Sequence, residues 1–400
     1  EIMEKKLNIG LFIDTFYPMI DGVINVVDNY AKRLNKIANV TVFAPKSRYN
    51  NFDDSTLPYK VVRCKRANLK ALKLDYDLPL PTLDSNFKKE IKNANLDIIH
   101  IHSPFSIGKM AANYGRKNNI PVVVTMHSQF KKDFYKSTKS KALTKIMLGI
   151  IARTFNKCDV LWTMNPACAN LSKEYGYKGK VEIVPNATDL VNEFTEEQIS
   201  QFKKEIQTKY NIQNDEKIFI NIGRINKLKN LDFVVDVCKV LKDKNFKFKL
   251  LLIGDGSDKK YFVSKVKKLE LENNIIFVGR VSDTQEKSKL FAISDLQIFP
   301  SFYDTDGIVR IEAAAFSVPT IFIKDSIASS TITNNVNGFI GENDKEKFAA
   351  AIINAFENKE NFGKVKENCH KDLYITWDAL MSNVIEKYKL LIKEKSCNKI

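Results

Sequence analysis

Two carboxylates eight residues apart, Asp304 and Glu312, lie in a stretch of the sequence that combines several chemically useful features. The stretch, residues 299–316, reads FPSFYDTDGIVRIEAAAF. The apolar run that ends before Pro300 predicts a buried strand, and apolar residues at helical spacing after Gly307 predict a helix that begins there. Backbone N–H groups and the helix dipole at such a start can hold an anion, so both carboxylates can face one ligand cleft.

This stretch also allows other interpretations. Asp304 can simply cap the helix while Glu312 is a solvated helix residue. Asp304 and Asp306 also form an Asp-x-Asp pair, which is an arrangement able to bind a divalent metal ion. No further Asp/His cluster accompanies the pair in the sequence, so we expect no metal.

A second segment, residues 223–230, reads GRINKLKN and carries three cations, of which Arg224 and Lys229 are the candidates for binding phosphate. Such a pair after a strand can neutralise phosphoryl oxygens through charge-assisted hydrogen bonds, or it can belong to an exposed ion-paired face. A glycine loop that ends at Gly22 has the same strand–loop–helix order. Its N–H groups can face a phosphate, and an ordinary strand-to-helix turn is the other interpretation.

Three of the four histidines belong to two predicted strand ends. His100 and His102 end the apolar run 96–102, and His127 ends the run 121–127. Ligands of open parallel sheets bind outside the carboxyl ends of the strands, so His102 and His127 are candidate site residues. We interpret His100 as structural. A leucine- and proline-rich loop at 65–86, with Tyr76, is either acceptor-facing or packed on its neighbours.

The alternation of strands and helices sets the expected architecture. It occurs twice along the chain, which predicts an α/β protein with two doubly wound parallel sheets. The length of 400 residues agrees with two domains. We expect an N-terminal domain over 1–190, a second domain over 191–375 and a C-terminal helix over 376–400, with the junction near 186–195.

Composition limits the cellular setting. No apolar run approaches the length of about 18 residues needed to span a membrane, and no apolar leader precedes the first strand, so we expect a cytoplasmic protein. The six scattered cysteines lack metal-ligand spacing, which favours reduced, mostly buried thiols. The net charge of +16 indicates an anionic partner: nucleic acid, a membrane surface or a phosphorylated substrate.

Much of this charge lies in residues 130–157, where eight basic residues stand against one acid and are interleaved with aromatic and aliphatic ones. We expect an amphipathic helix with one face in the core. The mixture also suits docking on an anionic membrane surface, and a merely solvated charged face is the other interpretation.

Five separated segments resemble motifs of the retaining family four glycosyltransferases: residues 17–23, 100–108, 125–128, 223–230 and 299–316. In the last segment Asp304 stands where that family usually has a glutamate, and Glu312 keeps the second glutamate of the motif. The resemblance implies the GT-B fold, in which two Rossmann-like domains face each other across a cleft and the final helix crosses back to the first domain.

The resemblance also implies roles for individual residues. Glu312 would bind the ribose, Asp304 a sugar hydroxyl, and Arg224 with Lys229 the donor diphosphate, without a metal or other cofactor. The catalytic candidates are Asp304, His127 and Glu312. The donor-binding candidates are Gly22, Arg224, Lys229, Arg280, Thr305, Asp306, Gly307, Ile308 and Glu312, and the acceptor-side candidates are His102 and Tyr76.

On this resemblance we expect a retaining hexosyltransferase that moves a sugar from a nucleotide sugar such as UDP-glucose to a membrane lipid, for example diacylglycerol, or a lipid-linked glycan. It would work as a peripheral protein on the inner membrane face. A transferase with a soluble or polysaccharide acceptor and a non-catalytic sugar-nucleotide-binding descendant are the alternatives. A nucleic-acid-binding protein lacks any recognition signature here, and a Rossmann dehydrogenase would carry GxGxxG in the first turn.

Overall fold

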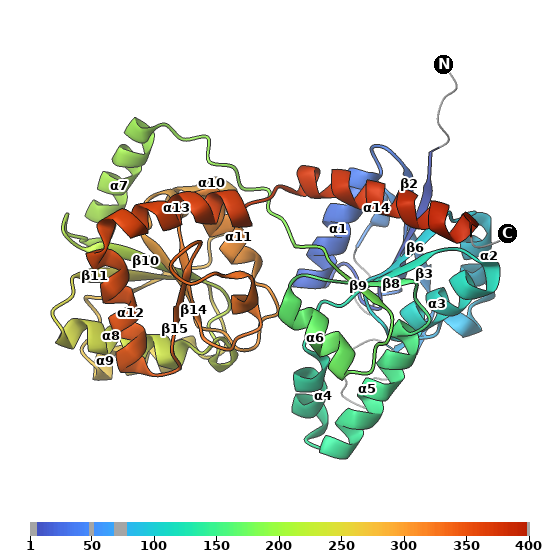
Figure 1. The fold of residues 1–400 in the computed structure, drawn as a ribbon, viewed down its shortest axis with the longest axis horizontal. Helices are drawn as coiled ribbons and strands as arrows, with labels where there is room; N and C mark the ends of the chain where they lie inside the picture. Colours follow the sequence, from blue (N-terminus) through green and yellow to red (C-terminus); the bar gives the residue numbers. More distant parts are fainter. Residues whose placement is uncertain (1–5, 48–51, 68–77, 398–400) are drawn as a thin grey trace. The chain divides into compact units, whose positions relative to one another are not determined.

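The computed structural model describes residues 6–47, 52–67 and 78–397, and the chain in it forms two compact units (Figure 1). Unit 1 comprises residues 1–185 together with 377–400, and unit 2 comprises residues 186–376. The chain thus passes from unit 1 into unit 2 at residue 186 and returns at residue 377.

Unit 1 is built on a seven-stranded parallel sheet with the order β3-β2-β1-β6-β7-β8-β9. Its strands β1, β6, β7 and β8 carry continuous apolar runs because parallel strands in the middle of such a sheet are covered on both faces. The strands are β1 (Asn8–Phe12), β2 (Asn39–Pro45), β3 (Lys60–Cys64), β6 (Ile98–Ile101), β7 (Val122–Thr125), β8 (Val160–Thr163) and β9 (Lys180–Ile183). Two short strands, β4 (Arg66–Ala67) and β5 (Leu78–Pro79), form a separate antiparallel pair.

Seven α-helices belong to the described part of unit 1. They are α1 (Gly22–Leu34), α2 (Ser85–Asn93), α3 (Ser106–Asn118), α4 (Phe130–Thr138), α5 (Lys141–Phe155), α6 (Pro166–Glu174) and α14 (Trp377–Cys397). Single 3-10 turns lie at η1 (Asp54–Thr56) and η3 (Pro81–Leu83). The basic segment 130–157 thus forms two helices, because Lys139 ends α4 in the left-handed conformation (φ 53°) and Ser140 caps α5.

The C-terminal helix α14 packs within unit 1. The ring of Tyr388 stacks on Trp162 of β8 with ring centroids 5.6 Å apart, and its hydroxyl lies 2.5 Å from Nδ1 of His100. At the start of α14, Trp377 packs edge-on to Tyr30 of α1. All these side chains are buried, so α14 completes the core of a sheet whose strands lie more than 190 residues earlier in the sequence.

Unit 2 has a six-stranded parallel sheet with the order β12-β11-β10-β13-β14-β15. Its strands are β10 (Lys217–Ile222), β11 (Phe248–Ile253), β12 (Ile275–Gly279), β13 (Leu296–Phe299), β14 (Thr320–Ile323) and β15 (Phe339–Gly341). Its α-helices are α7 (Glu196–Tyr210), α8 (Leu231–Asp243), α9 (Lys259–Lys268), α10 (Thr284–Ala292), α11 (Ile308–Ala315), α12 (Lys345–Glu357) and α13 (Lys359–Leu373), with 3-10 turns η4 (Lys227–Lys229) and η5 (Ala328–Thr331).

Alternate residues of these strands enter two separate cores. Phe219 and Leu250 pack with helices α8, α9 and α12 on one face, while Ile220 and Leu251 pack with α10 and α11 on the other. This period of two shows that helices cover both faces of the sheet. The predicted fold class, two doubly wound parallel sheets, is therefore confirmed.

The strand order of each sheet reverses direction at one place. In unit 2 this switch lies between β10 and β13, and in unit 1 it lies between β1 and β6. Loops that leave neighbouring strands in opposite directions open a crevice at the carboxyl edge of such a sheet, where ligands of this fold bind. The loops concerned are 223–230 and 300–307 in unit 2, and 13–21 and 102–105 in unit 1.

Candidate functional site

The switch point of unit 2 brings together two side chains that lie 75 residues apart in the sequence. Nζ of Lys229 lies 2.5 Å from Oδ1 of Asp304 in a half-buried ion pair. The two loops are also joined by Asn230, whose side-chain amide donates to the Pro300 carbonyl at 3.1 Å. The structure thus places these two predicted site residues in direct contact at the carboxyl edge of the sheet.

The turn before α11 has a specific cause. Gly307 adopts a positive φ of 75°, and a Cβ built there would lie 2.5 Å from the Phe299 ring, so only glycine fits. On the other side of the turn, Oγ of Ser301 accepts hydrogen bonds from the backbone N–H groups of Tyr303 and Asp304. These contacts fix where Asp304 stands relative to the first turn of α11.

Glu312 is the second carboxylate of the site. Its Oε1 accepts a hydrogen bond from Nζ of Lys287 in α10 at 2.6 Å. Its Oε2 is buried and has no hydrogen-bond partner among the residues that the structure describes. A buried carboxylate oxygen without a donor is costly, so this atom is a candidate to accept a hydrogen bond from a ligand.

Lys287 was not among the sequence-derived candidates. It comes from a helix 25 residues before Glu312 and belongs to no recognisable motif. Only the lysine's position in the first turns of a helix after β12, near the carboxyl edge, could have indicated it.

Asp306 differs from Asp304. Its carboxylate is buried and accepts from the guanidinium of Arg310, with Nε at 3.1 Å, and from Nδ2 of Asn186 at 3.0 Å. Asp304 and Asp306 are therefore held by separate cations, which does not favour a shared metal ion between them. Among the described residues, no group of three or more His, Cys, Asp or Glu side chains could hold a metal.

The other donor-side candidates lie on the same sheet edge. Arg224 follows β10 and Arg280 follows β12, and both are exposed. Their loops are packed closely through Gly254, whose Cβ would lie 1.9 Å from the Gly223 carbonyl. Thr305 and Ile308 are half-buried on either side of Gly307, and α11 begins at Ile308.

The histidine candidates meet at the carboxyl edge of the unit 1 sheet. Nδ1 of His102 lies 3.1 Å from Nε2 of His127, and the rings stack. Nε2 of His102 is buried without a hydrogen-bond partner in the described part of the chain. His100 is structural in its contacts, since Tyr388 and the hydroxyl of Thr125 (2.7 Å) occupy its two ring nitrogens.

Burial sets the charge of these rings. It lowers the pKa of His127 to about 4 and brings the pKa of His102 and of His100 well below the ordinary value of 6.5. Nearby, burial raises the pKa of Asp14 to about 6, although its carboxylate accepts from the Ile107 N–H at 2.7 Å. Asp14 lies two residues after the end of β1, at the switch point of the unit 1 sheet. The sequence did not indicate it as a site residue, because a single acid after a strand forms no recognisable motif.

Gly22 and Tyr76 are the two remaining predicted site residues. Gly22 is the first residue of α1, whose start is capped by the side chain of Asp21 accepting from the Ile24 N–H at 2.8 Å. A Cβ at Gly22 would meet nothing within 4 Å, so the space above this helix start is open. Tyr76 lies outside the described residues.

Comparison with known families adds an independent observation. The family described as Glycosyltransferase Family 4 matches residues 20–192, and the family described as Glycosyl transferases group 1 matches residues 202–372. The two matches follow each other along nearly the whole sequence. The chain belongs to these glycosyltransferases.

Individual relatives agree with this assignment. The glycosyltransferase is 24% identical over 409 residues to an alpha-monoglucosyldiacylglycerol synthase of Acholeplasma laidlawii, covering 97% of this chain and 100% of that protein. It is 27% identical over 406 residues to the synthase of the same name from Streptococcus pneumoniae, with 95% and 88% covered. The fold matches the Anabaena HepE protein in complex with UDP, at a TM-score of 0.74 and 15% identity, over 95% of this chain and 99% of that one.

A distinct surface of the glycosyltransferase lies on α4 and α5. Leu143, Ile146 and Ile150 follow each other at helical spacing on α5, with 51%, 60% and 48% of each residue exposed. The opposite side of α5 carries the buried Thr144, Ile151 and Phe155. Six exposed lysines lie on the same two helices and at the turn between them: Lys131, Lys132, Lys136, Lys139, Lys141 and Lys145. We call this surface the α4–α5 face.

No helix in the described part of the chain is both long enough and apolar enough to cross a bilayer.

The buried histidines predict how the stability of unit 1 depends on pH. Between about pH 6.5 and 4 the unfolded chain binds a proton at His127 and the folded chain does not, so acidification lowers the free energy of unfolding. Asp14 acts in the opposite sense between pH 3.8 and about 6, because its folded pKa is the higher one. Each group contributes a slope of at most about 1.4 kcal/mol per pH unit.

We expect His127→Gln to flatten the loss of stability on acidification and Asp14→Asn to steepen it. Urea titrations at a series of pH values would measure both effects, and the fluorescence of Trp162 and Trp377, the two tryptophans of the protein, reports unit 1 alone. If the free energy of unfolding of wild type and of His127→Gln depended on pH in the same way, the conclusion that the buried His127 ring is neutral would be contradicted.

Proposed function

We propose that this glycosyltransferase moves a hexose from a nucleotide sugar, UDP-glucose in the first instance, to a membrane lipid or lipid-linked glycan with retention of anomeric configuration. The observation that carries the donor part is the carboxyl edge of the unit 2 sheet. There Lys229, Asp304, Glu312 and the N-terminus of α11 lie around one switch point.

The donor diphosphate is the most demanding group to bind. As the glycosidic bond breaks, the leaving nucleoside diphosphate gains negative charge, and preorganised cations stabilise that charge in the transition state. Lys229 and Arg224 on the loop after β10 supply two cations, and the start of α11 at Gly307 and Ile308 supplies the N–H groups of a helix N-terminus. Lys229 is held by Asp304 before the donor arrives, so its ammonium is already oriented.

Glu312 fits the ribose. Its Oε2 lacks a donor in the described residues, and a ribose hydroxyl would provide one. Lys287 holds the other oxygen, so the carboxylate enters the site in one orientation. Asp304, one methylene shorter than a glutamate, would accept from a sugar hydroxyl that reaches closer to the loop.

The names of similar proteins support the choice of substrates. HepE was crystallised with UDP and, in a separate structure of TM-score 0.67, with UDP-glucose. Two sequence relatives that match over nearly their whole length are named alpha-monoglucosyldiacylglycerol synthases. For the present chain these substrates belong to the proposal, and retention of configuration follows from the family resemblance of 299–316. Two alternatives remain for the assays below to detect. One is transfer to a soluble sugar or a polysaccharide, and the other is binding of a sugar nucleotide without turnover.

On the acceptor side, His127 would approach the reacting sugar, with His102 holding its ring through the 3.1 Å contact. Both rings are neutral at physiological pH because burial lowers their pKa. A neutral imidazole donates one hydrogen bond from its N–H and accepts one at its other ring nitrogen, without bringing charge near the diphosphate.

The first prediction concerns the donor cations. Arg224→Ala or Lys229→Ala should cost about 2–4 kcal/mol of transition-state stabilisation, measured as kcat/KM for UDP-glucose with diacylglycerol in vesicles. Asp304→Asn should lower the rate about tenfold or more through the same site.

Lys227→Ala is the matched control, because Lys227 lies on the same loop but stacks over the Tyr261 ring at 4.3 Å. It should retain nearly full activity. Wild-type turnover in Lys229→Ala would remove this lysine from the site, and donor binding without transfer to any acceptor would identify a non-catalytic binder.

We also propose that transfer needs no metal, since Arg224, Lys229 and the α11 N-terminus already supply positive charge at the proposed diphosphate position. Excess EDTA should therefore leave the rate nearly unchanged. A loss of activity that manganese or magnesium restores would instead favour a metal bound at Asp304.

The α4–α5 face supports a peripheral membrane location. Three exposed aliphatic side chains beside six lysines match the composition of helices that lie in the bilayer interface. Each lysine near an anionic leaflet contributes about 1 kcal/mol, and the attraction decays within a Debye length of about 8 Å. We infer that this face docks on the inner surface of the membrane, where a lipid acceptor is available.

Vesicle co-sedimentation tests the docking. Binding should require anionic lipid, weaken with salt, and fall strongly when Lys131, Lys132, Lys136 and Lys139 become Glu. Ile146→Ser should weaken it further by removing buried apolar area. The matched control changes four exposed lysines of unit 2 to Glu, namely Lys260, Lys267, Lys268 and Lys347. Equal losses in both variants would show that only net charge matters, against a docked face.

A further inference from the structure

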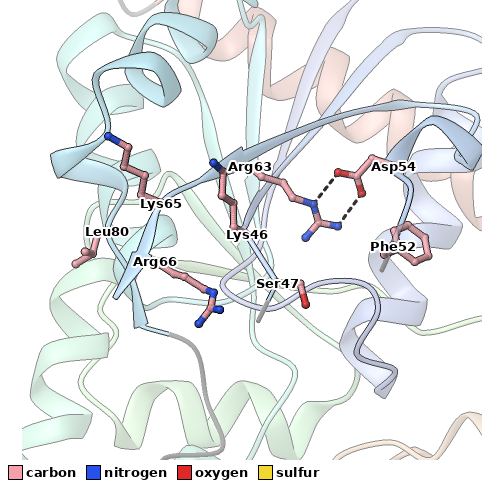
Figure 2. A pocket seen from close by; sticks show the side chains of 8 residues that line it. All are labelled: Lys46, Ser47, Phe52, Asp54, Arg63, Lys65, Arg66 and Leu80. Carbon is pink, nitrogen blue, oxygen red and sulfur yellow. Dashed lines mark hydrogen bonds and ion pairs between the residues drawn. The ribbon is translucent and has the colours of Figure 1, made fainter. Parts of the chain in front are cut away.

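Arg63–Asp54 and Arg310–Asp306 are arginine–aspartate pairs that differ in their burial. In unit 1, Nε and one terminal nitrogen of Arg63 each lie 2.7 Å from a different oxygen of Asp54, and this pair is partly exposed at the side of a cavity (Figure 2). In unit 2, the side chains of Arg310 and Asp306 are only 3% and 2% exposed. The second pair is therefore an ion pair in the protein interior, two residues after Asp304 of the candidate donor site.

Stability alone does not explain a buried ion pair. Both charges lose their hydration when they leave water, and replacing such a pair by apolar side chains of similar size is often neutral or stabilising. A buried pair can instead restrict the local conformation, because its hydrogen bonds are satisfied in few arrangements. Asp306 stands between Asp304 and the start of α11, so the conformation that it restricts is that of the donor loop.

Arg310 fixes the peptide group that leads into α11. Its Nε donates to the Asp306 carboxylate at 3.1 Å and to the Asp306 backbone carbonyl at 3.3 Å, and a terminal nitrogen also bonds the carboxylate. The backbone N–H of Arg310 donates to the Gly307 carbonyl at 3.0 Å. The Asp306 carbonyl and the Gly307 N–H belong to one planar trans peptide and point in opposite directions. The guanidinium therefore sets the direction of the Gly307 N–H, which points away from it.

The other carboxylate oxygen of Asp306 is held by a distant part of the chain. It accepts a hydrogen bond at 3.0 Å from Nδ2 of Asn186, which lies 120 residues earlier in the sequence. The backbone that carries Asn186 is bonded in turn, since the Thr188 N–H donates to the Ile375 carbonyl at 3.1 Å. All these residues belong to unit 2. Both oxygens of the buried Asp306 are thus engaged, and its place in the unit is fixed from two sides.

We propose that Asp306 is a positioning residue of the donor site. Its two partners, Arg310 and Asn186, hold the loop in one conformation. That conformation places the Asp304 carboxylate and the Gly307 N–H where the glucose and the diphosphate of the donor need them. The family resemblance makes Asp306 a donor-binding candidate, whereas here its side chain acts through its neighbours in the loop. This inference rests on the donor site proposed above.

Asn186→Ala is the primary variant for the test. It removes one hydrogen bond and keeps the ion pair, whereas Asp306→Asn would leave the Arg310 guanidinium buried without a counter-charge, which is strongly destabilising. Isothermal titration of the whole protein with UDP-glucose and with uridine monophosphate (UMP) gives two dissociation constants. UMP lacks the glucose and the β-phosphate, and its ribose would bind Glu312, which Lys287 holds independently of Asp306.

The expected result is a change in the ratio of the two dissociation constants. Asn186→Ala should bind UDP-glucose about tenfold more weakly and UMP at most about twofold more weakly, because a small displacement of groups that meet the sugar and the diphosphate is costly. A merely structural role for Asn186 would lower the unfolding temperature and the fraction of protein that binds, equally for both ligands, and would leave the ratio unchanged.

Asn337→Ala is the matched control in the same unit. Asn337 is also buried, its Nδ2 donates to a carboxylate oxygen of Asp372 at 3.2 Å, and its Oδ1 accepts from the Thr333 N–H at 2.9 Å. Because this variant loses two hydrogen bonds, its unfolding temperature in circular dichroism should fall at least as far as that of Asn186→Ala. Its ratio of dissociation constants should equal that of wild type.

A raised ratio in Asn186→Ala together with an unchanged ratio in Asn337→Ala supports the positioning role of Asp306. An unchanged ratio in Asn186→Ala, or an equal shift in the control, overturns it and leaves the donor site standing. If wild type itself does not bind UDP-glucose, the donor proposal fails, and this inference fails with it. The binding of UDP-glucose by wild type therefore distinguishes the two failures.

Discussion

Parallel strand pairing is the constraint on which the rest of this molecule depends. When all strands of a sheet run the same way, their carboxyl ends share one edge, and every strand-to-helix loop emerges there. Residues 221–224 and 299–307 meet because β10 and β13 are neighbours in that arrangement, with Asn221 donating to the Ile298 carbonyl at 2.8 Å. The ion pair of Lys229 and Asp304 and the histidine pair of unit 1 both lie on such edges.

In each unit, one further local feature determines the chemistry at the carboxyl edge of the sheet. In unit 2 this feature is Gly307. Because it has no Cβ, α11 can begin directly against the Phe299 ring, and the N–H groups of the first turn of α11 lie at the switch point. In unit 1 it is burial, which keeps three imidazoles neutral next to a carboxyl whose pKa is raised. Part of the positive charge of the chain lies outside these edges, on the α4–α5 face.

The sequence alone predicted the fold class, because alternating strands and helices with two-sided apolar runs admit few architectures. It also named Lys229 and Asp304 as residues of one donor site, and the structure brings their side chains into contact, while their role in binding a donor stays a prediction. Lys287 and Asp14 could not be found in this way, because their roles arise from contacts between elements far apart in the chain. Asp306 shows the reverse case. Its spacing from Asp304 suggests a metal-binding pair, yet its carboxylate accepts hydrogen bonds from Arg310 and Asn186, which only the packed structure reveals.

The return of the chain to unit 1 has a consequence for biogenesis. Tyr388 bonds to His100 across 288 residues, and the intervening chain contains all of unit 2. On the ribosome, unit 2 is therefore complete before unit 1 can bury Trp162 and the neighbouring apolar side chains beneath α14. The N-terminal sheet must wait with part of its core uncovered, and at synthesis rates of about 5–20 residues per second this exposure lasts many seconds. The nascent chain is thus a natural client for chaperones that shield apolar surface until the last helix arrives.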